Sequence, residues 1–320
     1  MKKRRRKRTR IPEITMSLPV EEIIVEAGNS NKPLLNARLA ELSNLSSEET
    51  AAFNQSWAAI ETKQRQQSVH RLVELAEENL ELNFDNIFKH CLSDPDDEVR
   101  ARSIEGLCEN EEAALITPLI NMLEQDDSEK VQIAAAMALG KFAMLAEHKK
   151  LRSCFMSRIQ EALLAVISNR NSTVEIRRRA LEAAAPLSLP QVKTAITEAY
   201  QSQNPRLKTS SIYAMGKNCD PSWLPVLLKE LADTDAGVRY EAASACGELE
   251  EEKAVPHLIK LVNDTDDDVR ISVIKALGKI GGTQAKECLK QFLNSPDKAI
   301  AQASKQALTE LETIENLISS

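Results

Sequence analysis

The side chains best suited to catalysis or metal binding are scattered along this chain of 320 residues. None of the four histidines lies at metal-ligand spacing from another or belongs to an HExxH motif; they are His70, His90, His148 and His257. The closest pair among the six cysteines is Cys91 and Cys108, 17 positions apart, so there is no CxxC pair for a metal or a redox disulfide. We therefore expect no metal and no cofactor, and we expect reduced, mostly buried thiols.

Three Gly-Lys pairs resemble part of a phosphate-binding loop: Gly140-Lys141, Gly216-Lys217 and Gly278-Lys279. A Walker loop requires Ser or Thr at the next position to reach the metal ion, and here the next residues are Phe142, Asn218 and Ile280. The Gly-x-Ser-x-Gly motif of a serine nucleophile is also absent. The sequence thus predicts a protein that is not an enzyme.

The net charge of −7 conceals two parts of opposite sign. Residues 1–10 contain eight basic groups and no acid: Lys2, Lys3, Arg4, Arg5, Arg6, Lys7, Arg8 and Arg10. The rest of the chain has 41 − 8 = 33 basic and 48 acidic residues, a net charge of −15. Such a tail attracts RNA, ribosomes, DNA or anionic lipid, and it could also contact the protein's own acidic body. If the protein contacts nucleic acid, it is expected to do so through the tail only, since the acidic body repels phosphate.

No segment approaches the ~20 apolar residues that span a bilayer. The basic start is not followed by the apolar core of a signal peptide, because acids and prolines interrupt residues 11–28. These observations predict a cytoplasmic protein.

An internal repeat organises most of the chain. An apolar anchor recurs at spacings of 32, 45, 31, 31, 31 and 31 residues, at Val99, Val131, Ile176, Leu207, Val238, Val269 and Ile300. Seven positions after every anchor stands Gly or Ala, as expected where two helices approach closely. The anchor and positions +4, +7 and +8 form one stripe of an amphipathic helix.

Acidic turns precede these helices, and glycines follow at position +9. Aspartates at −5 and −3 are expected to cap the N-terminus of the following helix. The +9 glycines, which are Gly140, Gly216, Gly247 and Gly278, are interpreted as helix-ending signals. The repeated unit is therefore helix, acidic turn, helix and glycine turn, in about 31 residues.

This pattern resembles the HEAT-repeat family, in the short type first associated with phycobilisome lyases. The resemblance is carried by the segments Asp94–Leu107, Asp233–Gly247 and Asp264–Gly278, and it covers roughly residues 81–315. It implies an all-α, armadillo-like α-solenoid (an alpha-alpha superhelix) of about seven helical hairpins. The first helix of each hairpin would lie on the convex side and the second would line the concave side. The basic residue at +1, as in Arg239, would pair with a turn Asp of its own or a neighbouring repeat.

Two relatives of this repeat type are enzymes. Deoxyhypusine hydroxylases bind iron through His-Glu pairs, but here the four histidines are followed by Arg71, Cys91, Lys149 and Leu258, so that activity is not expected. Bilin lyases hold a pigment in the concave groove, and no residue of this sequence carries that activity by motif. A bilin-lyase-like or other small-molecule enzyme remains an alternative.

Two regions depart from the repeat. The interval from Val131 to Ile176 has 14 extra residues, which predict a lengthened second helix, a polar link and a new first helix from about Cys154 to Ile167. Before the repeats, Ser46 and Glu49 predict a capping box. The predicted organisation is a disordered basic tail over 1–15, a linker with a short helix over 16–47, an N-terminal helical cap over 48–80 and a solenoid over 81–320.

What remains for function is the surface of the second helices, where positions +2, +3 and +6 are expected to face away from the packing stripe. Tyrosine and arginine are favoured at interfaces, and they gather here in a hypothetical patch for a protein or peptide partner: Arg178, Arg179, Glu182, Tyr213, Tyr240, Glu241 and Lys275. An ordinary mixed polar face is the alternative. The sequence therefore predicts a non-catalytic scaffold that binds a partner on the concave face, with the enzyme and a tail-tethered polyanion adaptor as the other readings.

Overall fold

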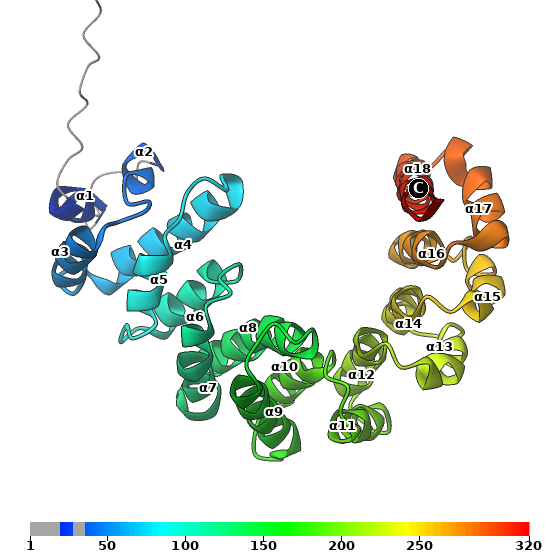
Figure 1. The fold of residues 1–320 in the computed structure, drawn as a ribbon, viewed down its shortest axis with the longest axis horizontal. Coiled ribbons are helices and arrows are strands. Elements are labelled where there is room, and N and C mark those ends of the chain that lie inside the picture. Colours follow the sequence, from blue (N-terminus) through cyan, green and yellow to red (C-terminus); the bar gives the residue numbers. More distant parts are fainter. Residues whose placement is uncertain (1–19, 28–35, 320) are drawn as a thin grey trace, which may run out of the picture. The chain divides into compact units, whose positions relative to one another are not determined.

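The computed structural model describes residues 20–27 and 36–319, and their regular structure is entirely helical (Figure 1). The chain divides into two compact units, residues 1–109 and residues 110–320. The basic tail lies outside the described residues. The division at residue 109 does not test the predicted boundary between cap and solenoid at residue 80, which stays a prediction.

Unit 1 contains six described helices: α1 (Val20–Ala27), α2 (Asn36–Ala40), α3 (Ser47–Trp57), α4 (Thr62–Glu78), α5 (Asp85–Cys91) and α6 (Asp97–Gly106). The predicted capping box opens α3: the Ser46 amide donates to the Glu49 carboxylate at 2.9 Å, and the Glu49 amide donates to the Ser46 hydroxyl at 3.3 Å. Large apolar side chains of α3 and α4 contribute to the core of unit 1, where Phe53, Val69 and Leu72 are completely buried.

A buried polar cluster around Asp94 joins α3, α4 and the turn before α6. Asp94 is 6% exposed and Arg65 is 7% exposed. The Trp57 indole nitrogen donates to Asp94 at 2.9 Å, and Arg65 forms an ion pair with Asp94 at 3.0 Å. The Asp96 amide also donates to Asp94, at 2.9 Å. The −5 aspartate thus binds its own turn and earlier helices, while Asp96 at −3 caps α6, so only the −3 position acts as a helix cap.

Unit 2 is an α-solenoid of six helical hairpins, which with α5–α6 make the seven predicted. The first helices are α7 (Ile116–Gln125), α9 (Ser153–Ser168), α11 (Pro190–Tyr200), α13 (Leu224–Glu230), α15 (Val255–Ile259) and α17 (Gly282–Gln291). The second helices are α8 (Glu129–Glu147), α10 (Val174–Ala184), α12 (Pro205–Asn218), α14 (Ala236–Leu249), α16 (Asp267–Ile280) and α18 (Lys298–Ser319). Each second helix packs on the next, and within unit 2 this row lines the inner side of the curve (Figure 1).

The 14 extra residues form what was predicted for them: a lengthened second helix, which is α8, then a link and a new first helix, which is α9. The predicted stripe is buried: every anchor is at most 6% exposed, and every residue at +4 is fully buried. The outward assignment of position +3 is wrong for two residues, because Ser210 and Ser272 are buried between adjacent repeats. The Ser210 hydroxyl donates to Glu182 at 2.6 Å, and the Ser272 hydroxyl donates to the Tyr240 carbonyl at 3.0 Å.

The +9 glycines do not end their helices. They lie inside α8, α12, α14 and α16, and each faces the +7 alanine of the next repeat. A Cβ added to Gly216 would stand 2.7 Å from the Ala245 Cα, and one added to Gly247 would stand 2.8 Å from the Ala276 Cα. These glycines are therefore the points at which neighbouring second helices approach most closely. The missing side chains allow the row of second helices to pack more tightly than the row of first helices.

The cysteines also differ from the prediction. Cys91, Cys246 and Cys288 are buried, but Cys108, Cys154 and Cys219 are exposed, and all six are free thiols. Burial raises the pKa of the Cys246 thiol to about 12, so this thiol is a packing residue rather than a nucleophile.

Basic residues at +1 form a ladder with the turn of the following repeat, as the resemblance implied. Arg239 pairs with Asp264 at 2.8 Å, Lys208 with Asp233 at 2.9 Å, and Arg270 with Asp297 at 3.2 Å. A hydrogen bond from the Asp235 amide and another from Lys208 lower the pKa of Asp233 from 3.8 to about 2.

This shift predicts acid-sensitive stability. A depressed folded-state pKa contributes stability that is complete above the unfolded value near 4 and is lost as pH falls toward 2. With its side chain 21% exposed, Asp233 should contribute roughly 1–2 kcal/mol. Urea unfolding should show that the free energy of unfolding falls less between pH 5 and pH 2.5 for Asp233→Asn than for the natural protein. Asp127→Asn, an exposed turn residue without a hydrogen bond or ion pair to the described residues, should leave this decrease unchanged.

Candidate functional site

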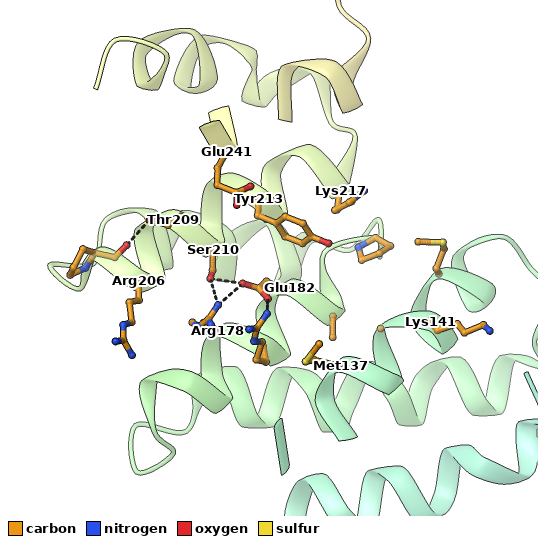
Figure 2. Close-up of a pocket in the computed structure, with 16 residues that line it drawn as sticks. Met137, Lys141, Arg178, Glu182, Arg206, Thr209, Ser210, Tyr213, Lys217 and Glu241 are labelled. Carbon is orange, nitrogen blue, oxygen red and sulfur yellow. Dashed lines mark hydrogen bonds and ion pairs between the residues drawn. The ribbon is translucent and has the colours of Figure 1, made fainter. Parts of the chain in front are cut away.

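A groove on the inner face of unit 2 lies where α8, α10, α12 and α14 come together, and it encloses about 760 Å³. Five of the seven predicted patch residues line it: Arg178, Arg179 and Glu182 from α10, Tyr213 from α12 and Glu241 from α14 (Figure 2). The structure therefore brings together side chains from three consecutive repeats. Tyr240 and Lys275 are exposed on α14 and α16 but are not part of its lining.

The two arginines are neutralised by neighbouring acids. Arg178 pairs with Glu175 at 2.6 Å and with Glu182 at 3.1 Å. Arg179 contacts the same two carboxylates at 3.3 and 3.0 Å. The Arg178 pairing is the leading reason that the pKa of Glu175 is lowered. This four-residue cluster has no net charge, so Arg178 and Arg179 do not form an anion site in the groove.

Exposed apolar side chains concentrate around this groove. Among the described residues, six large apolar side chains are exposed: Leu80, Met137, Met144, Tyr213, Tyr240 and Leu293. Met137 and Met144 are 54% and 46% exposed, and both line the groove with Tyr213, which is 36% exposed. Tyr240 follows on α14 at 40% exposure. Four of the six thus lie on α8, α12 and α14, and Met and Tyr are residue types enriched at interfaces.

Glu241 is the acidic residue of the groove without a counter-ion. It is half-buried and makes no hydrogen bond or ion pair with the described residues. Burial, followed by the charge of Glu182, raises the pKa of Glu241, and only Lys217 acts in the opposite direction. Lys217 is itself paired with Glu248 at 3.0 Å.

The sequence analysis missed the two methionines. Met137 stands at +6 after Val131, the same column as Glu182 and Tyr213, but the patch was drawn only from the central and C-terminal repeats. Applying the same column to the Val131 repeat would have found it. Met144 lies one heptad later on the lengthened α8, beyond the length of the ordinary repeat.

In the described part of the chain, no group of three or more His, Cys, Asp or Glu side chains is placed to hold a metal ion. Within the same residues, no helix combines the length and the apolar composition needed to cross a bilayer.

A family model described as HEAT repeats matches residues 85–157 and 224–309. This chain contains HEAT repeats. The unmatched stretch between the two, residues 158–223, includes Arg178, Glu182 and Tyr213. The groove residues Met137, Met144 and Glu241 lie within the matched stretches.

Solved structures agree with a HEAT solenoid. Yeast importin-beta (Kap95p) is 14% identical with a TM-score of 0.53, and the match covers 91% of this chain and 46% of that one. The Kap95:Nup1 complex gives 14% identity, a TM-score of 0.51 and the same coverage. Human deoxyhypusine hydroxylase in complex with glycerol covers 92% and 96% at 16% identity, but its TM-score of 0.32 supports no inference. No curated protein matches the chain. At these identities the importin-beta match shows the fold alone, and this chain spans about half of importin-beta.

Proposed function

We propose that this protein is a non-catalytic scaffold that binds a segment of a protein partner in the groove formed by α8, α10, α12 and α14. The observation that carries the proposal is the gathering of exposed Met137, Met144, Tyr213 and Tyr240 on these helices. Large apolar side chains grouped on one face are typical of an interaction site. The pre-formed floor of Arg178, Arg179, Glu175 and Glu182 would limit the ordering cost on binding.

Two further observations support this function. Kap95, which shares the fold, is described in complex with Nup1. The 31-residue spacing supports the short, phycobilisome-lyase-like repeat type as part of the proposal. The small-molecule enzyme has less support, because Arg178 and Arg179 in the groove are already paired with acids. The polyanion adaptor depends on the tail, which lies outside the described residues.

A random-peptide display library selected against the full chain tests the proposal. Enriched peptides should lose about tenfold or more in affinity for a Tyr213→Ala, Met144→Ala double variant. The matched control is Leu80→Ala, Leu293→Ala, which removes two exposed apolar side chains that are not part of the groove lining and should leave binding unchanged. Failure to enrich any peptide, or enrichment only of peptides that bind the groove variant normally, would exclude this function.

A further inference from the structure

We propose that the bound segment presents a lysine or arginine to Glu241 and Tyr213 and an adjacent apolar side chain to Met137 and Met144. This inference rests on the proposed function and specifies the chemistry of its partner. The acids near the groove differ in whether a cation already neutralises them.

Glu182 is fully engaged by Arg178, Arg179 and the Ser210 hydroxyl. Glu248, which lies near Tyr213 and Lys217, is held by Lys217 at 3.0 Å and Lys279 at 2.7 Å. Glu241 has no such partner among the described residues, and the direction of its pKa shift is that of a half-buried carboxylate lacking a counter-ion. A cation from a partner would supply the missing charge.

The side chain next to Glu241 suits a cation as well. Figure 2 shows the Glu241 carboxylate beside the Tyr213 ring, and the charge of Glu241 contributes to the raised pKa of the Tyr213 hydroxyl. Lys217 already lies 5.9 Å from the centroid of that ring, and the ring of Tyr213, 36% exposed, leaves room for a second positive group. An arginine can pair with a carboxylate and stack on an aromatic ring at the same time.

The other wall of the groove is apolar and adaptable. Met137 and Met144 lie seven residues apart on α8, which places them on one face of the helix, and both are about half exposed. Flexible thioethers can adjust to different apolar side chains. Arg206, the exposed cation of the lining, points away from Glu241 in Figure 2, so it does not compete for that carboxylate.

The experiment measures the affinity of groove-dependent peptides by fluorescence anisotropy. The selected peptides should be enriched in Lys or Arg next to an apolar residue. Glu241→Gln should weaken them about tenfold, whereas Glu287→Gln, the same charge change on an exposed residue of α17, should not. Glu241→Lys should reject these peptides and, in a fresh selection, enrich acidic ones. Thermal unfolding of each variant checks that the fold is retained.

The outcomes separate the two proposals. If groove-dependent peptides are recovered but carry no basic residue, or bind Glu241→Gln as well as the natural protein, this inference is overturned and the scaffold function stands. If no groove-dependent peptide is recovered, the scaffold function itself fails. A synthetic peptide of residues 1–12 completes the test: Glu241-dependent binding tighter than that of every selected peptide would assign the groove to this chain's own tail and overturn a separate partner.

Discussion

Asp94→Ala is expected to destabilise unit 1 by about 3–5 kcal/mol, the cost of breaking a buried ion pair by removing one partner. The substitution leaves the Arg65 guanidinium, 7% exposed, without its carboxylate, and it leaves the Trp57 indole N–H without its acceptor. Because α3, α4 and the turn before α6 meet at this one carboxylate, their packing should loosen together.

The measurement can be confined to unit 1, because the chain has only two tryptophans, Trp57 and Trp223. In a Trp223→Phe background, Trp57 fluorescence during urea unfolding reports the cluster directly. Asp94→Asn should fall between the natural protein and Asp94→Ala, since an amide can still accept from Trp57. Glu77→Ala, an exposed position on α4, should change stability by less than about 0.5 kcal/mol.

A double variant sharpens this result. Arg65→Met combined with Asp94→Leu should cost less than the sum of the two single changes, because neither charge is then left buried alone. A decrease of only about 0.5 kcal/mol in the free energy of unfolding for Asp94→Ala would show that this buried carboxylate does not stabilise unit 1.

Gly216→Val is expected to cost about 3 kcal/mol or more, because the added side chain meets backbone rather than a movable side-chain end. A Cβ at this position would stand 2.7 Å from the Ala245 Cα and 2.9 Å from its Cβ. Contact could be relieved only by moving α12 away from α14, which would open the buried stripe between them.

Glycine-to-alanine changes provide the graded comparison. Each change gains about 1 kcal/mol of helix propensity. A net decrease in the free energy of unfolding therefore shows that the added methyl group meets an unfavourable contact. Gly216→Ala should destabilise unit 2, and Gly140→Ala should do so less, because its nearest neighbour, the Ala183 Cα, is 3.2 Å away. Gly237→Ala lies in the exposed first turn of α14, where the added Cβ would meet only the end of the Asp235 side chain, at 3.0 Å, so it should be neutral or stabilising. Circular dichroism during urea unfolding measures all three, and equal stability of Gly216→Ala and Gly237→Ala would show that the helices do not meet at Gly216.

Local features of the fold could be predicted because they depend on residues close in sequence. The Ser46–Glu49 capping box, the −3 aspartate caps and the lengthened α8 each follow from a few neighbouring side chains. The neutralisation of Arg178 and Arg179 was equally local, because Glu175 and Glu182 stand three or four residues away on the same helix, and that spacing was overlooked.

By itself, the sequence determined the all-α class, the repeated hairpin and the buried stripe, since a 31-residue period and helical spacing encode them directly. Only the tertiary structure decided what the +9 glycines do, because a glycine near a helix end suits both a cap and a close contact, and the choice depends on Ala245 and its counterparts one repeat away. It also decided which charges remain available in the groove. Glu241 and Glu248 are both half-buried glutamates of α14, but lysines of the neighbouring helices form ion pairs only with Glu248. Such contacts between helices are set by how the repeats stack.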